Sequence, residues 1–270
     1  MKAFSFFFLL LALFLFPFAV LAKAEPSLSA KHAALLDAVN GDFLWEKNAN
    51  TPVPMASTTK IATAIAVLEA LPMDREITVD ERSVGVEGTS AYLKVGETLT
   101  VCELLHALLL ASANDAATAL AIACDGSVEA FAERMNRLAE ALSLESTHFA
   151  NPHGLPNNEH YTTARDLARL AAYAMHNPDF SKIVAKKTYS CTTSLQARTF
   201  RNHNKLLSLS EDAVGIKTGF TKASGRCLVG AAERDGALLI SVTLSAPNDW
   251  NDHKTLWNYG FSLLGLSREA

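Results

Sequence analysis

The sequence lacks the short motifs that bind metals or carry redox chemistry. None of its four cysteines forms a Cys-x-x-Cys pair, and no His-Glu-x-x-His stretch is present. The sequence therefore does not indicate a zinc finger, a thioredoxin-like redox protein or a zincin metalloprotease. Two histidines, His153 and His160, fall in loop sequence, and we interpret them as structural residues, not as zinc ligands. We expect no metal ion and no organic cofactor.

Positive charge is also scarce. The 270 residues include 24 lysines and arginines against 28 acidic residues, which gives a formal net charge of −4. There is no basic run and no stripe of alternating basic and aromatic residues. This composition argues against nucleic acid as a partner. The substrate therefore has to be recognised by specific contacts instead of bulk charge.

Long apolar runs are missing after the first two dozen residues. Residues 4–22 are largely apolar and uncharged, and Ala22-Lys23-Ala24 offers the small residues that a signal peptidase needs. We expect residues 1–24 to be a signal peptide, which makes the protein secreted or places it in the cell-wall or periplasmic space. The alternative is an uncleaved N-terminal anchor with the rest of the chain facing outward. Residues 251–270 are short and mixed in charge, so no C-terminal membrane anchor is expected.

The state of the cysteines stays open at this stage, because export permits disulfide bonds. Cys102 and Cys124 lie at similar distances on either side of residues 112–114, so an antiparallel helix pair could bring them together. Buried free thiols are an equal alternative. The same two possibilities hold for Cys191 and Cys227.

The sequence does contain strand patterns near both ends. Residues 33–39 and 42–47 flank Asn40-Gly41, which is a strong hairpin signal. Further strands are expected at 212–220, 225–234 and 237–244, followed by a closing amphipathic helix at 253–264.

Helical patterns fill the middle of the chain, and residues 76–99 are expected to be irregular. The expected helices are 57–71, 101–111, 114–124, 128–142 and 163–177. We therefore expect an α+β (α/β mixed) fold in one domain, residues 25–270. Its antiparallel β-sheet is completed by both termini and is flanked by helices, with a large, mostly helical insertion.

Ser57 and Lys60 have the spacing of a serine nucleophile and its base. If a helix begins near Ser57, Lys60 lies one turn further along the same face, and its amine can reach the hydroxyl. A partly desolvated lysine can take the proton of such a serine. The simpler alternative is a helix cap beside a solvated lysine, because S-x-x-K occurs by chance in many proteins.

Two further patterns carry polar groups. Ser112-Ala113-Asn114 falls in the tight link between two expected helices, where its simpler interpretation is a pair of caps. Lys217-Thr218-Gly219 falls near the end of an expected strand, where Lys217 and Gly219 share one face. Glycine there lets a peptide backbone lie alongside, with lysine and threonine ready for a carboxylate. A charged edge strand is the simpler interpretation.

Together and in this order, S-x-x-K, S-x-N and K-T-G are much more specific than any one alone. The sequence resembles the low-molecular-weight penicillin-binding proteins, the serine D-alanyl-D-alanine carboxypeptidases of peptidase S11 type. The resemblance runs through essentially the whole mature chain and includes residues 149–155 and 163–167. It implies a β-lactamase/transpeptidase-like fold, peptidoglycan stem peptides as substrates and β-lactam antibiotics as covalent inhibitors.

The resemblance also implies catalytic roles. Ser57 would be the nucleophile that becomes acylated, and Lys60 the base that activates it. Ser112 would relay the proton towards the leaving D-alanine. Asn114 would hold Lys60 and the substrate amide.

On the strand side, the resemblance implies substrate binding by Lys217, Thr218, Gly219 and Phe220. Lys217 and Thr218 would lie near the terminal carboxylate, and the backbone N–H groups of Ser57 and Phe220 would form the oxyanion hole. Many relatives have histidine where this chain has Phe220, which should alter the pocket wall and leave the backbone donor intact.

Two questions stay open. In some relatives an arginine before the K-T-G strand helps to bind the substrate carboxylate, and the nearest match here is His203. The closest alternative function is a β-lactamase. A class A enzyme places a glutamate in a loop after S-x-N, and here Glu145 and Glu159 fall in the interval without a recognisable pattern. A further alternative is an inactive wall-binding or sensor module.

Overall fold

The computed structural model describes residues 24–268, so the expected signal peptide lies outside the described residues except for its last position. Its main sheet has five strands in the spatial order β2 (Asp42–Lys47), β1 (His32–Asp37), β9 (Ala237–Leu244), β8 (Gly225–Arg234) and β7 (Ala213–Thr221). Every neighbouring pair is antiparallel. The last strand along the chain therefore lies at the centre of the sheet.

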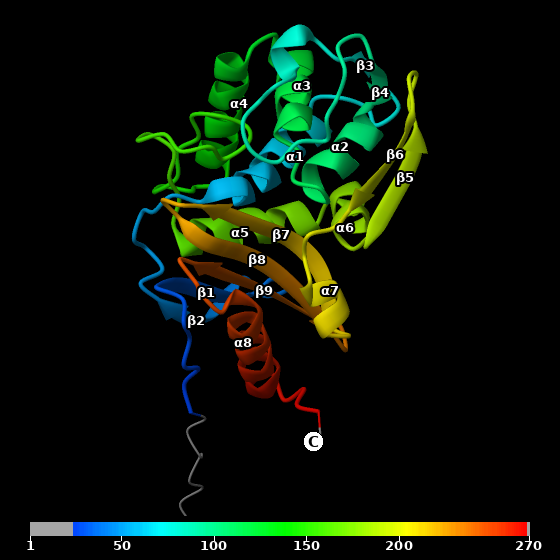
Figure 1. Cartoon of the computed structure of the whole chain (residues 1–270). Coiled ribbons are helices and arrows are strands. Elements are labelled where there is room, and N and C mark those ends of the chain that lie inside the picture. Colours follow the sequence, from blue (N-terminus) through cyan, green and yellow to red (C-terminus); the bar gives the residue numbers. More distant parts are fainter. Residues whose placement is uncertain (1–23, 269–270) are drawn as a thin grey trace, which may run out of the picture.

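Helices cover both faces of this sheet (Figure 1). Helix α8 (Asp249–Leu263) packs on one face, where Trp257 and Phe261 are buried against Leu239 of β9. Helix α5 (Ala164–Met175) packs on the opposite face and joins the sheet to the helical region. Both faces of the central strands are therefore buried, and on the α8 side Ser241 and Thr243 of β9 form hydrogen bonds with the ring of His253.

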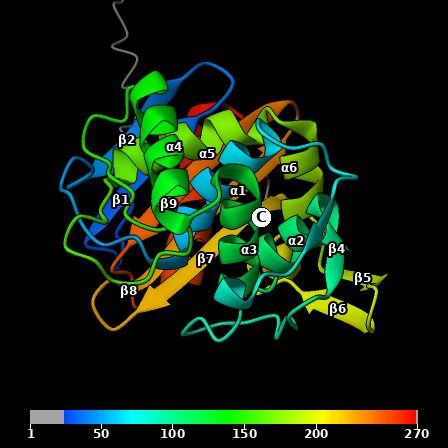
Figure 2. The same cartoon turned by 90° about the horizontal axis from the view of Figure 1, so that it is seen from above.

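The helical region is built around α1 (Lys60–Leu68), which continues from the 3₁₀ turn η1 (Ala56–Thr59). Figure 2 shows α1 among its neighbours. These are α2 (Val101–Leu109), α3 (Asn114–Asp125), α4 (Val128–Ala141) and α5. Because α1 is surrounded, its alanines and isoleucines are buried around the whole helix.

The described residues also form several smaller elements. Two short antiparallel pairs are β3 (Glu76–Thr78) with β4 (Thr98–Thr100), and β5 (Thr188–Thr192) with β6 (Ala197–Arg201). The remaining helices are η2 (Glu81–Ser83), α6 (Pro178–Val184) and α7 (Leu206–Leu209).

The expected α+β fold with one antiparallel sheet is confirmed, and the bounds expected for β8 and β9 match the structure. The capping box at Thr100 is also present. The end of the first strand was predicted two residues too late, at Val39. It ends at Asp37 because the Asp37 carboxylate accepts hydrogen bonds from the amides of Val39 and Asn40 and so turns the chain.

Two helical predictions need correction, and two helices were missed. Helix α8 starts at Asp249 instead of residue 253, because its first turn has the acidic residues that a helix N-terminus favours. Helix α1 ends at Leu68, three residues early. Helices α6 and α7 were not predicted, although Asn177-Pro178, a capping side chain followed by proline at the first position, marks the start of α6.

All four cysteines lie in the described residues, and each is a free thiol. The disulfide alternative for Cys102–Cys124 and for Cys191–Cys227 is therefore wrong. Burial raises the pKa of the Cys227 thiol to about 11, which favours the protonated form. Within residues 24–268, no helix is both long and apolar enough to span a bilayer.

Candidate active site

A cleft of about 390 Å³ lies where the helical region meets the edge strand β7. It is lined by Ser57, Thr89, Ser112, His203, Lys205, Thr218, Gly219, Phe220, Arg226, Asp249 and Trp250. Segments from all three sequence motifs thus reach one cleft. Lys60, Asn114 and Lys217 lie behind its wall as buried side chains.

Ser57 and Lys60 meet through the local geometry of η1 and α1. Ser57 lies in the 3₁₀ turn and Lys60 is the first residue of α1, so one helical turn separates them. The Lys60 Nζ donates to the Ser57 Oγ over 3.0 Å. The contact expected from the S-x-x-K spacing is therefore present.

Two further oxygens surround the Lys60 amine. Nζ lies 2.7 Å from the Oδ1 of Asn114 and 2.6 Å from the backbone oxygen of His153. Three acceptors match the three donors of an ammonium group. In the neutral amine, two N–H groups serve Asn114 and His153, and the lone pair is left for the Ser57 hydroxyl.

The contribution of the His153 carbonyl was not predicted. It depends on Gly154, whose φ is +89° and where a Cβ atom would lie 2.0 Å from the backbone oxygen of Ala56. Only glycine lets this loop pack so closely behind Ser57. Asn151 fixes the turn, because its Oδ1 accepts the amide hydrogen of Gly154 over 2.7 Å. The Asn-Pro-x-Gly sequence was the available signal.

Asn114 does not cap a helix, contrary to the simpler interpretation. Residue Ala113 is the N-cap of α3, and it makes no side-chain cap bond. The Asn114 side chain is engaged elsewhere, with Oδ1 on Lys60 and Nδ2 on the backbone oxygen of Glu87 over 2.6 Å.

Ser112 is held by the lysine of the third motif. The Lys217 Nζ donates to the Ser112 Oγ over 3.0 Å and to the backbone oxygen of Thr218 over 2.9 Å. Ser112 has a φ of +61°, a left-handed conformation that aims its side chain out of the tight link between α2 and α3. No direct hydrogen bond joins Ser112 to Ser57 or Lys60 among the described residues.

Gly219 brings strand β7 against the backbone of Ser57. A Cβ atom at this position would lie 3.0 Å from the Ser57 nitrogen and 3.2 Å from the Cβ of Ala56. The neighbouring Phe220 side chain is 66% exposed and therefore forms an outer wall of the cleft. Close approach of β7 and η1 thus depends on the absence of a side chain at residue 219.

Burial shifts the pKa of both site lysines downwards. The pKa of Lys60 falls well below its usual value because the side chain is desolvated and because Lys217 adds a second positive charge. Desolvation also lowers the pKa of Lys217, to about 7. The neutral amine that a base requires is therefore accessible near neutral pH.

The outer part of the cleft contains His203, the nearest match to the arginine of some relatives, and four residues that the sequence did not single out. His203 and Lys205 come from the segment before α7, and Arg226, Asp249 and Trp250 come from β8 and α8. The Arg226 guanidinium makes a bidentate contact with Asp249, at 2.8 and 2.9 Å from its NH2 group, and lies over the Trp250 ring. Burial and the nearby Lys217 lower the pKa of His203, so Lys205 and Arg226 are the cations of this wall.

The two loop histidines are engaged in hydrogen bonds. The His160 Nδ1 accepts from the Ala150 amide over 3.0 Å, so its Nε2 carries the proton and donates to Thr59. Burial lowers the pKa of His153 to about 3 and that of His160 to about 4. Residues 24–268 contain no group of three or more potential ligands arranged for a metal ion.

Glu145 and Glu159 both lie away from the cleft. Glu145 lines a separate hollow beside α4, and Glu159 is exposed in the turn at 157–160. Asp249 is the one acid among the lining residues, and it is engaged by Arg226. No free carboxylate in the described part of the cleft is available to activate a water.

Comparison with known proteins agrees with this geometry. Residues 19–248 match the family model of Peptidase_S11, D-alanyl-D-alanine carboxypeptidase. This match covers most of the chain, and the chain therefore belongs to the Peptidase_S11 family of serine D-alanyl-D-alanine carboxypeptidases. The family resemblance and the enzyme class expected from the motifs are confirmed.

Individual relatives carry more than one activity in their names. A D-alanyl-D-alanine carboxypeptidase of Streptomyces sp. strain K15 is 35% identical over 263 residues, 90% of each chain. The crystal structure of the Streptomyces K15 DD-transpeptidase superposes with a TM-score of 0.85 at 35% identity, over 88% of this chain and 99% of that one. A D-alanyl-D-alanine endopeptidase of Pseudomonas aeruginosa is 33% identical over 211 residues, 76% of this chain and 67% of that protein.

Proposed function

We propose that residues 25–270 form one catalytic domain that removes the terminal D-alanine from peptidoglycan pentapeptide stems through an acyl-enzyme on Ser57. The observation that carries this proposal is the Lys60 amine, buried and lying 3.0 Å from the Ser57 hydroxyl. Its other two acceptors leave one position for the serine, which is the arrangement that a general base needs.

In the acylation step, the Ser57 Oγ attacks the carbonyl carbon of the penultimate D-alanine while its proton passes to the Lys60 Nζ. The new ester bond forms as the peptide C–N bond breaks. The leaving amine of D-alanine takes up the proton that Lys60 received from Ser57, relayed through the Ser112 hydroxyl, which Lys217 holds. Asn114 keeps Lys60 in place during both transfers.

The substrate backbone would lie along the edge strand β7. Lys217 and Thr218 would receive the terminal carboxylate, and Gly219 leaves room for the peptide beside Ser57. The amides of Ser57 and Phe220 would stabilise the oxyanion, and such donors are typically worth ~3–4 kcal/mol of barrier. Water then hydrolyses the ester and regenerates the Ser57 hydroxyl.

The test is release of D-alanine from a synthetic peptide that ends in D-Ala-D-Ala. We expect release by the native protein and none by Ser57→Ala, whereas Ser208→Ala, an exposed serine in α7, should behave as wild type. Release that survives Ser57→Ala would overturn the assignment of the nucleophile. A peptide supplied with an acceptor amine would show whether water or the amine takes the acyl group.

The reaction with penicillin distinguishes a carboxypeptidase from a β-lactamase, because the two differ in how fast the acyl-enzyme is hydrolysed. The absence of a free carboxylate among the described cleft residues supports a long-lived penicilloyl adduct on Ser57. Mass spectrometry of the labelled peptide should find the adduct hours after mixing. Rapid turnover with no trapped adduct would favour the β-lactamase, and a folded protein that is never labelled would favour an inactive wall-binding module.

We also propose that the chain is exported and cut after Ala24. The support is the apolar segment 4–22 with its small-residue exit in the sequence. N-terminal sequencing of the active protein from soluble and membrane fractions tests this. Glu25 as the first residue supports a free exported enzyme, and retention of Ala3 on the membrane-bound form supports the anchor.

A further inference from the structure

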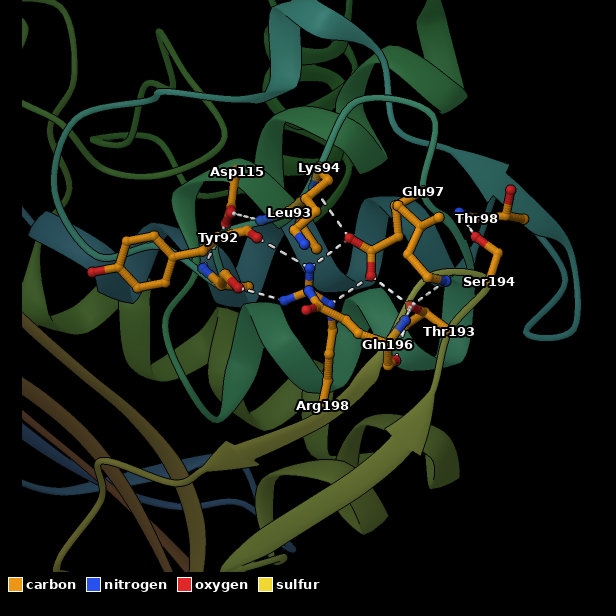
Figure 3. Close-up of polar contacts among 12 residues, drawn as sticks. Tyr92, Leu93, Lys94, Glu97, Thr98, Asp115, Thr193, Ser194, Gln196 and Arg198 are labelled. Carbon is orange, nitrogen blue, oxygen red and sulfur yellow. Dashed lines mark hydrogen bonds and ion pairs between the residues drawn. The ribbon is translucent and has the colours of Figure 1, made fainter.

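Residues 87–97, here called the strap, run along the helical side of the cleft without forming helix or strand. A segment outside regular structure has to satisfy its backbone polar groups in another way. In the strap, side chains from α3 and β6 take this role, and Figure 3 shows them converging on it. The strap contributes Thr89 to the cleft wall.

The first attachment is Asn114. Its backbone amide donates to the Thr89 oxygen over 2.7 Å, and its side-chain Nδ2 donates to the Glu87 oxygen over 2.6 Å. Because Nδ2 is turned to the strap, Oδ1 faces the Lys60 amine at 2.7 Å. The strap therefore selects the amide orientation that offers Lys60 an acceptor.

The second attachment is Asp115, which is only 1% exposed. Its carboxylate accepts hydrogen bonds from the Ser90 hydroxyl at 2.6 Å, the Ala91 amide at 2.9 Å and the Leu93 amide at 3.0 Å. A buried carboxylate can only accept, so it needs such donors. The residue next to Asn114 thus binds the strap as well.

The third attachment is a buried ion pair from the other side. Arg198 of β6 donates to the backbone oxygens of Ala91 and Tyr92 over 2.6 and 3.0 Å. Its Nε donates to Glu97 over 2.6 Å, and the Thr193 hydroxyl donates to the same carboxylate over 2.6 Å. The side chains of Arg198 and Glu97 are 6% and 0% exposed. The planar guanidinium lets one residue bridge two parts of the strap.

The backbone between these attachments has an unusual conformation. Tyr92 has a φ of +57° although it is not glycine, and its side chain is 82% exposed. Such a conformation persists only where the surroundings enforce it. Here the enforcing contacts are Arg198 on its carbonyl and Asp115 on the two flanking amides.

We propose that Arg198 and Glu97 are positioning residues for the acylation of Ser57. Their ion pair fixes the strap, and the strap fixes the Asn114 amide towards Lys60. The inference rests on the proposed function, because it concerns the same reaction. Neither residue lines the cleft, so both act through Asn114.

The first test compares three variants by their second-order rate constants for labelling with a fluorescent penicillin. Arg198→Met should lower this rate constant roughly tenfold or more, because misplacement of a catalytic group by a fraction of an ångström is costly. Arg198→Lys should recover part of it by keeping a charge beside Glu97. Arg234→Met is the matched control. Arg234 is also a buried arginine paired with a carboxylate, 10% exposed, and lies at the end of β8 away from the cleft.

Each variant is measured at the same interval below its own thermal midpoint, so that loss of stability is removed from the comparison. Wild-type labelling within a factor of about two is expected for Arg234→Met. If wild type is not labelled, the proposed function fails. If wild type is labelled and Arg198→Met reacts as fast as Arg234→Met, the positioning role is overturned.

The second test is a double-mutant cycle with Asn114→Ala. If Arg198 acts through Asn114, Arg198→Met should have little further effect on labelling in the Asn114→Ala background. An equal loss in both backgrounds would mean that Arg198 supports only the fold, and would overturn the proposal. If Arg198→Met does not fold, Arg198→Lys and Glu97→Gln take its place in the same cycle.

Discussion

The two sides of the cleft hold their lysines differently. On the helical side, the Lys60 amine has three oxygen acceptors, which come from η1, α3 and the loop at residues 151–155. On the strand side, the Lys217 amine has two, the Ser112 hydroxyl and the carbonyl of the next residue in its own strand. Both amines are buried, yet only Lys60 is fully engaged.

This difference agrees with two separate proposed roles, proton transfer on the helical side and substrate binding on the strand side. Proton transfer needs reacting groups fixed to a fraction of an ångström, and contacts from several segments provide this. Binding of a peptide backbone needs free hydrogen-bonding groups, and β7, as the outermost strand of the sheet, has them. Under the proposed function, the helical side would perform the chemistry and the strand side would recognise the substrate.

Lys60→Met should produce the largest effect on labelling by penicillin. Loss of a general base typically costs about 10²- to 10⁴-fold, so we expect a reduction in this range. Lys254→Met, an exposed lysine of α8, is the control and should leave the rate unchanged. Labelling of Lys60→Met within threefold of wild type would contradict a chemical role for the helical side.

Gly219→Ala tests the close approach between the two sides. The added Cβ would lie 3.0 Å from the Ser57 nitrogen, so β7 or η1 has to move by a few tenths of an ångström. We expect about a tenfold lower acylation rate at little cost in stability. Unchanged kinetics would mean that the contact between β7 and the Ser57 amide is dispensable.

The lowered pKa of Lys217 should make the free energy of unfolding depend on pH. Its pKa is about 7 in the folded protein against an ordinary value of 10.5. Between these values the unfolded chain binds the additional proton, so raising the pH stabilises the fold, by at most ~1.4 kcal/mol per pH unit.

The measurement is urea unfolding of wild type and Lys217→Met at pH 7.0, 7.75 and 8.5. The upper end of this range reaches the ordinary pKa of cysteine, but wild type and variant share the same four thiols, so the thiol contribution cancels when the two curves are compared. We expect the stability of wild type to rise with pH more steeply than that of the variant. Parallel curves would show that Lys217 is charged in the folded protein at these pH values.

Phe220→Ser should have the smallest effect. The side chain is 66% exposed, and the substitution keeps the backbone amide. We expect labelling to change by less than about threefold, in line with the small effects of surface substitutions. A larger loss would mean that the Phe220 ring contacts the substrate. The strand side would then bind substrate through a side chain as well as through its backbone.

The sequence predicted the parts of the site that follow from local spacing. Ser57 and Lys60 are one helical turn apart, and the strand pattern at 225–244 gave correct bounds, because neighbouring residues determine both. The boundary errors at Asp37 and Asp249 arise where a carboxylate acts on the nearby backbone, by accepting turn amides at Asp37 and by favouring the N-terminus of α8 at Asp249.

The rest of the site depends on contacts between distant segments. The carbonyl of His153 lies 93 positions from Lys60, and Arg198 lies 101 positions from Glu97. The contact between Arg198 and Glu97 has no periodicity or motif that would identify it, and Asn-Pro-x-Gly marks a turn at residues 151–154 without indicating which group its carbonyl meets. A backbone carbonyl has no residue-type signature at all, so only the folded chain identifies it.

The central position of β9 has a consequence for how the molecule assembles. The strand formed by residues 237–244 is synthesised after the other four strands of the sheet, yet it has to insert between β1 (His32–Asp37) and β8 (Gly225–Arg234), which lie far apart in the sequence. Contacts of such long sequence separation make folding slow, since a large loop has to close before they form. Until β9 is in place, the two hairpins β1–β2 and β7–β8 are separate pieces with open edges, so a nascent chain is most prone to aggregate before residues 237–244 emerge.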